Sequence, residues 1–103
     1  MTEAATAAGP GAVVVRLPGP LRELVGGRRE LSVSPAPATV GDLLDALSVE
    51  HPVLVRRILD ETGTVRQFVN IYVGDDDIRH GEGLATPLAP GTVVHLLPSV
   101  AGG

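Results

Sequence analysis

Cysteine, lysine and tryptophan are absent from the 103-residue sequence, and phenylalanine and tyrosine occur once each. Without cysteine there is no disulfide framework, thiolate metal site, iron–sulfur cluster or cysteine nucleophile. Without lysine there is no P-loop lysine, Schiff-base lysine or side-chain amine to accept an isopeptide bond. The scarcity of aromatic rings also removes the stacking platforms that bind single-stranded nucleic acid. Several large classes of enzyme and binding protein are therefore excluded.

The charge balance is acidic, because 8 basic residues, all arginine, stand against 12 acidic residues and give a net charge of −4. Such a chain lacks the basic face that nucleic-acid phosphates require, so no nucleic-acid partner is expected. No segment approaches the roughly 20 apolar residues of a membrane span, and Glu3 lies where a secretory peptide needs positive charge. We expect a soluble, cytoplasmic protein with no membrane partner.

Length and composition predict one folded domain with short extensions. With 44% hydrophobic residues, a chain of this size has enough material for a single core. Residues 1–11 are predicted to be a disordered lead-in without an assigned role. Residues 12–98 are predicted to form the domain, and residues 99–103 a flexible tail that ends in Gly-Gly.

Four segments have the alternation or the β-branched content typical of strands: 12–17, 28–34, 67–73 and 92–97. A helical turn over 21–25 and a glycine pair are predicted to connect the first two strands. Pro90-Gly91, just before the last strand, has the residue types of the centre of a type II turn.

One amphipathic helix is predicted to begin after Thr39 and to end near Glu50. Asp42 follows Thr39 by three residues, the spacing of a capping box. Four apolar residues recur at i, i+3, i+4 and i+7 and form one stripe: Val40, Leu43, Leu44 and Leu47. Because Pro52 disfavours helical backbone at the residue before it, residues 53–59 are predicted to form a second, short helical segment.

The order strand, strand, helix, strand, irregular segment, strand is typical of an α+β protein of the β-grasp class. We expect a mixed sheet of four to five strands with one main helix packed on one face. The preference for right-handed crossovers predicts that the third strand runs parallel to the first.

The third strand separates an aliphatic side, Val69, Ile71 and Val73, from a side with Phe68, Asn70 and Tyr72. An asparagine amide enters a dry core only when its hydrogen bonds are satisfied, so the aliphatic side is predicted to face inward. The same alternation directs His95 and Leu97 outward in the last strand. We predict a partner-docking face made of four residues: Phe68, Tyr72, His95 and Leu97. In the alternative, the lead-in or arginine side chains partly cover the two aromatic rings.

No catalytic or metal-binding pattern is evident. Asp75 opens an acidic run that with His80 and Glu82 suggests a cation loop, but His80 occupies the sixth position, where an EF-hand needs glycine. We therefore predict a solvated turn there. The histidines lack zinc-site spacing, and Ser99 lacks the strand–turn–helix context of a nucleophile. We expect no metal site, no catalytic residue and no enzymatic activity in this chain.

The final residues, Val100, Ala101, Gly102 and Gly103, follow the last predicted strand almost directly. Glycines without Cβ atoms can pass through a narrow channel and leave the terminal carboxylate open to attack. The backbone terminus itself is therefore a candidate reactive centre.

From residue 13 to residue 103 the sequence resembles the ubiquitin-like sulfur carriers of the MoaD/ThiS type, and within them the CysO-type carriers linked to cysteine biosynthesis. His95 also lies as far from the last glycine as the histidine of ubiquitin's interaction patch. The matching segments are Leu21-Arg22, Gly26-Gly27, RQFVNIYV at 66–73, DDDIR at 75–79, GLAT at 83–86 and LPSVAGG at 97–103.

The resemblance implies chemistry at Gly103. An E1-like adenylyltransferase of the MoeB/ThiF type would use ATP and Mg²⁺ to join the Gly103 carboxylate to AMP. A sulfur donor or sulfurtransferase would then displace AMP and leave a C-terminal thiocarboxylate for an acceptor biosynthetic enzyme. The activating enzyme would recognise Val100, Ala101 and Gly102 as the tail, and this chain would bind no cofactor.

Two alternatives to a sulfur carrier stay open. The chain could be a ubiquitin-like modifier conjugated through Gly103 to lysines of target proteins. It could also be the non-catalytic small subunit of a sulfur-transferring synthase. Cysteine, thiamin, molybdopterin and natural-product pathways are all compatible with one tail, and the resemblance favours cysteine.

Overall fold

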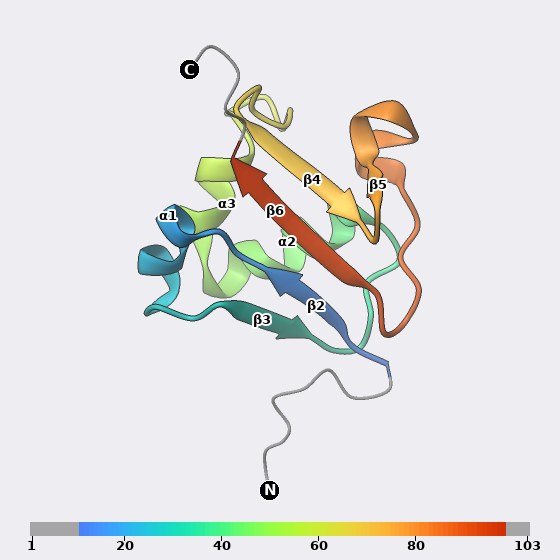
Figure 1. Cartoon of the computed structure of the whole chain (residues 1–103), viewed down its shortest axis with the longest axis horizontal. Helices are drawn as coiled ribbons and strands as arrows, with labels where there is room; N and C mark the ends of the chain where they lie inside the picture. The colour runs from blue at the N-terminus through green and yellow to red at the C-terminus, as the bar shows by residue number, and fades with distance from the viewer. Residues whose placement is uncertain (1–10, 99–103) are drawn as a thin grey trace, which may run out of the picture.

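The computed structural model describes residues 11–98, which fold around one mixed sheet (Figure 1). The sheet order is β3-β2-β6-β4-β5. Residues 1–10 of the predicted lead-in and the predicted tail, which includes Val100, Ala101, Gly102 and Gly103, lie outside the described residues. The strands are β2 (Val13–Arg16), β3 (Glu30–Val33), β4 (Val69–Val73), β5 (Asp76–Asp77) and β6 (Val93–Pro98).

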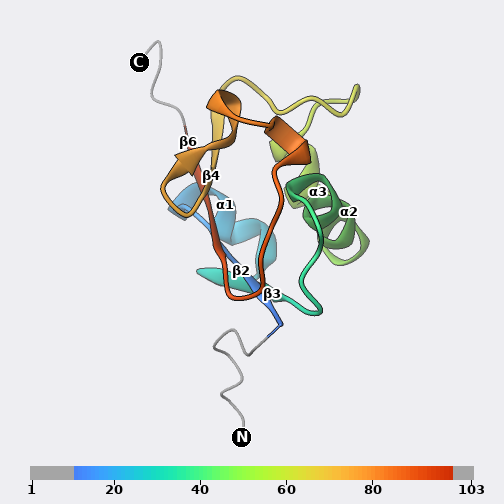
Figure 2. The same ribbon diagram turned by 90° about the vertical axis from the view of Figure 1, so that its right-hand side faces the viewer.

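Two helices pack side by side against one face of the sheet, as Figure 2 shows. These are α2 (Val40–Glu50) and α3 (Pro52–Ile58). The shorter helical turns are α1 (Gly19–Arg22), η1 (Glu23–Val25), η2 (Ile78–His80) and η3 (Gly83–Ala85). The predicted β-grasp architecture is confirmed, and none of the helices described is long and apolar enough to cross a membrane.

The strand directions correct one prediction. β2 pairs antiparallel with β3 and parallel with β6, and β6 pairs antiparallel with β4. β4 therefore runs antiparallel to β2, not parallel to it. The handedness rule fixes the hand of a parallel crossover, but it does not decide which strands are parallel. Here the last strand enters between β2 and β4 and becomes the parallel neighbour of β2.

Helix α2 forms as its sequence predicts. The Thr39 side chain accepts a hydrogen bond from the Asp42 backbone N–H at 3.1 Å, which satisfies one of the free donors of the first turn. The buried residues of α2 are the four of the apolar stripe, Val40, Leu43, Leu44 and Leu47. The helix ends at Glu50, and α3 begins at Pro52, a position where a missing N–H costs little.

The core lies between these helices and the inner side of the sheet. Ile71 of β4 and Leu96 of β6 are each 1% exposed, and Leu54 of α3 is fully buried. Val69 is also buried, and Val73 packs against the core at its edge. The predicted inward orientation of the aliphatic side of the third strand is therefore confirmed.

The turn before β6 was predicted correctly from its sequence, whereas strand β5 was not. Gly91 has φ +87°, and Thr92 N–H donates to the Ala89 carbonyl at 3.1 Å, as expected of the predicted type II turn. Strand β5 was not predicted, because Asp76 and Asp77 have low strand propensity. They pair with Val73 and Tyr72 at an exposed sheet edge, where backbone pairing needs no apolar side chains.

Candidate docking face

The strand register brings three of the four predicted docking residues, Tyr72, His95 and Leu97, to the outer side of the sheet. Phe68 was expected in the strand, but it lies in the turn just before β4. Tyr72 lies directly opposite His95, and Leu97 lies opposite Asn70. His95 is also opposite Arg16 of β2. Directly opposite residues share one side of a sheet, so these side chains form two adjacent rows across β2, β6 and β4.

The four predicted docking residues differ in exposure. Phe68 is 58% exposed and Leu97 is 45% exposed, whereas Tyr72 and His95 are half-buried. Phe68 is thus the more accessible of the two aromatic rings, and the alternative in which the lead-in or arginine side chains partly cover them stays open. Large apolar side chains that remain exposed beside a sheet edge are typical of a surface that binds another protein.

Phe68 and Leu97 line the same apolar hollow, which holds about 160 Å³. Pro98, the last described residue, also lines it, so the hollow adjoins the point where the chain continues into residues 99–103. Val69, the neighbour of Phe68, lines it too, and the rest of the lining comes from segments distant in the sequence, which sequence analysis did not link to Phe68: Pro18, Pro20, Leu21 and Arg57. The hollow is named the Phe68 hollow below.

Hydrogen bonds of Arg79 hold the segment that carries Phe68. The guanidinium donates to Asn70 Oδ1 at 2.6 Å and to the Arg66 carbonyl at 2.7 Å. Asp77 Oδ1 accepts a hydrogen bond from the Arg79 backbone N–H at 2.9 Å. The predicted outward Asn70 therefore finds its partner on the surface. Arg79 is a positioning residue that sequence analysis did not identify, since nothing in the linear order links it to Asn70.

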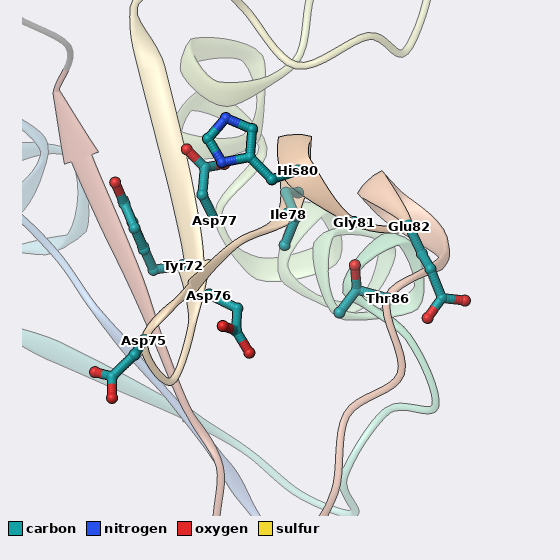
Figure 3. Close-up of a pocket in the computed structure, with 9 residues that line it drawn as sticks. All are labelled: Tyr72, Asp75, Asp76, Asp77, Ile78, His80, Gly81, Glu82 and Thr86. Atoms are coloured by element: carbon teal, nitrogen blue, oxygen red, sulfur yellow. The ribbon is translucent and has the colours of Figure 1, made fainter.

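The acidic run lines a separate hollow of about 450 Å³ together with Tyr72, His80 and Glu82. Figure 3 shows the Asp75 side chain directed away from those of Asp76 and Glu82. Between residues 11 and 98, no three His, Cys, Asp or Glu side chains are placed to hold a metal ion together. The acidic run begins in a turn and continues into the edge strand β5.

The sheet order, the helices on one face and the exposed residues of β6 define a ubiquitin-like β-grasp protein. The model of the ThiS family matches residues 15–103, and the chain belongs to this family, as the resemblance implied.

Its relatives include sulfur carriers and protein modifiers. The sulfur carrier protein CysO of Mycobacterium tuberculosis is 41% identical over 93 residues, which cover 88% of this chain and 98% of the relative. Small archaeal modifier protein 3 of Haloferax volcanii is 37% identical over 82 residues, 80% of this chain and 88% of the relative.

Solved structures agree with this assignment. The crystal structure of Mycobacterium tuberculosis CysO superposes with a TM-score of 0.78 at 38% identity, covering 85% of this chain and 99% of the other. A chain of the Amycolatopsis orientalis BexX/CysO complex superposes with a TM-score of 0.79 at 33% identity, covering 88% and 99%. That carrier therefore has a protein partner in its crystal.

Proposed function

We propose that this chain is a sulfur carrier that accepts sulfur at the carboxylate of Gly103. The observation that carries the proposal is the extent of the family match. It runs through residue 103 and so includes the Gly-Gly end, and the match to the sulfur carrier CysO covers 98% of that protein. The folded body between residues 11 and 98 supplies a docking face.

The chemistry proceeds in two steps. A carboxylate is a poor electrophile, because its charge repels nucleophiles and its oxygen is a bad leaving group. A Gly103 carboxylate oxygen attacks the α-phosphorus of ATP on an E1-like MoeB/ThiF-type partner, and pyrophosphate leaves. Hydrosulfide, supplied by a sulfur donor or sulfurtransferase, then attacks the carbonyl carbon and loses its proton to solvent. The C–S bond forms, the bond to AMP breaks, and the product is a thiocarboxylate.

The docking face positions the tail in the partner. Phe68 and Leu97 would bury their apolar surface against the adenylyltransferase, with Tyr72 and His95 in the next row of the sheet. Because the Phe68 hollow includes Pro98, contact there brings residues 99–103 next to the partner. Val100, Ala101 and Gly102 would then pass into its active site.

The thiocarboxylate would be consumed by an acceptor biosynthetic enzyme. Its sulfur is softer and more nucleophilic than oxygen, so it can attack an electrophilic acceptor without release of free sulfide. The similarity to CysO favours cysteine as the product. ATP and Mg²⁺ would belong to the activating partner.

A second function, conjugation to other proteins, is supported by the 37% identity to a small archaeal modifier protein. It would share the adenylation step and differ in the acceptor, which would be a lysine amine of a target. The chain itself has no lysine, so side-chain-linked polymers of it could not form.

Intact-protein mass spectrometry separates these functions. The chain is incubated with ATP, the E1-like adenylyltransferase of the same genome and a sulfide source. A sulfur carrier gains the mass that replaces one oxygen by sulfur, confined to Gly103, whereas a modifier produces amide adducts on other proteins. Deletion of Gly103 is the control and should leave the melting temperature unchanged. Absence of any ATP-dependent change at Gly103 would contradict both functions.

A further inference from the structure

A second hollow lies beside the Phe68 hollow and shares Pro18 and Leu97 with it. It holds about 200 Å³ and is named the His95 hollow. Its other lining residues are Arg16, Leu17, Arg22, His95 and Leu96. The two hollows thus lie on either side of a ridge formed by Pro18 and Leu97, next to the end of β6.

The charge around this ridge is opposite in sign to that of the whole chain. Arg16, Arg22 and Arg57 line the two hollows, and neither lining includes an aspartate or glutamate. The chain as a whole carries −4. Its acidic run lies elsewhere, after the turn at Gly74, whose N–H donates to Val93 at the start of β6. Three arginines therefore gather near the end of β6, whereas the acidic run lies near its start.

The three guanidinium groups keep donors free for a partner. Arg16 contacts Glu30 Oε2 through Nε at 3.2 Å, and Arg22 donates from Nε to the Leu17 carbonyl at 3.0 Å. A guanidinium has five N–H donors, so the terminal nitrogens of both can still bind a carboxylate. The exposed Arg57 side chain makes no hydrogen bond or ion pair with any residue between 11 and 98.

We propose that this surface binds a partner element in which an apolar side chain is flanked by carboxylates. The apolar side chain enters the Phe68 hollow, one carboxylate binds Arg16 and Arg22 in the His95 hollow, and another binds Arg57. The inference deepens the proposed function, because the element belongs to the activating adenylyltransferase. The chain carries −4 overall, so an acidic surface is attracted where arginines gather without carboxylates in the lining, and charge thereby favours an approach of the partner to the end of β6.

The test compares Arg57→Glu with Arg56→Glu. Both residues are exposed in α3 and the change in net charge is identical, but Arg57 lines the Phe68 hollow and Arg56 does not. The KM for the carrier in ATP–pyrophosphate exchange is measured with the adenylyltransferase of the same genome. We expect Arg57→Glu to raise KM about tenfold or more, and Arg56→Glu to change it less than about twofold. Arg22→Glu should act like Arg57→Glu, and thermal melting confirms that each variant is folded.

Salt dependence provides a second readout. Raising the NaCl concentration should increase KM for the native chain more than for Arg57→Glu, because the variant has lost a screened attraction. If Arg56→Glu and Arg57→Glu changed KM equally, or if neither changed it, the inference of an acidic partner element would be wrong. The proposed function would still stand, provided that the native chain supports ATP–pyrophosphate exchange. Absence of exchange by the native chain would count against both.

Discussion

The side chains on the two sides of strand β6 differ sharply in exposure to solvent, although they alternate along one backbone. On the inner side, Val94 and Leu96 are each 1% exposed. On the outer side, His95 is half-buried and Leu97 is 45% exposed. Side chains on the inner side stabilise the fold, whereas those on the outer side are available to a partner. Stability and recognition can therefore be changed separately by choosing alternate positions in the same strand.

Leu96→Ala should have the largest effect on stability. The side chain is enclosed by the core, so its truncation loses transfer free energy and leaves a cavity, at a cost of about 2–5 kcal/mol in the free energy of unfolding. Leu97→Ala is the matched control, one residue further along, and should cost less than about 1 kcal/mol. Urea denaturation measures both. If both variants lost the same free energy of unfolding, the inner and outer sides of β6 would contribute equally to stability, and the comparison would be wrong.

Leu97→Asp should have the next largest effect. It should impair adenylation of the chain by its partner and leave folding largely unchanged. A charged group would be placed in the apolar part of the docking face, so we expect at least a tenfold fall in kcat/KM for adenylation, about 1.4 kcal/mol. Val49→Asp is the control, since Val49 is 81% exposed but lies on α2, on the helical side of the sheet. If the two aspartates weakened activation equally, the outer side of β6 would not be the docking face.

The inner side of the sheet could be predicted from sequence because it depends on local periodicity. The stripe of α2 and the alternation of β4 both match the observed burial. Strand β5 and the direction of β4 relative to β2 could not be predicted in this way. Both depend on which strands become neighbours, and β6, the last strand of the sequence, lies between β2 and β4 in the sheet.

The docking face was predicted only in part, for a related physical reason. Phe68 and Leu97 were identified from strand alternation, which is a local signal. Arg57, which lines the same hollow, lies on a helix packed against the other face of the sheet. Its position follows from packing of α3 near the end of β6, and no pattern in the sequence encodes that proximity.

Gly91→Ala tests whether the turn before β6 fixes which residues face outward. Gly91 has φ +87°, and an added Cβ would meet no atom within 4 Å, so the cost is conformational, about 1 kcal/mol. Gly91→Asn should cost less, because asparagine tolerates positive φ better than alanine. Chemical denaturation measures both. An NMR contact between Tyr72 and His95 should persist in each variant, and its loss would show that the register depends on this turn.

The smallest effect on stability should come from lowering the pH. It should be confined to the loop between α3 and β4, which contains Asp60. Hydrogen bonds from the Thr62 hydroxyl and from the backbone N–H groups of Thr64 and Thr62 lower the pKa of Asp60 below its ordinary value. A carboxyl with a lower pKa in the folded state stabilises the fold above its unfolded pKa, and this contribution disappears as pH falls through the folded pKa. The inner side should not respond, because no polar or charged residue among those described is buried. An NMR pH titration should show amide shifts at Thr62 and Thr64 that follow Asp60, with Leu96 unchanged, and Asp60→Asn should remove them. If the Leu96 amide shifted with the same pH midpoint as Asp60, the loop and the core would be coupled. The inner side of the sheet would then respond to changes at the surface.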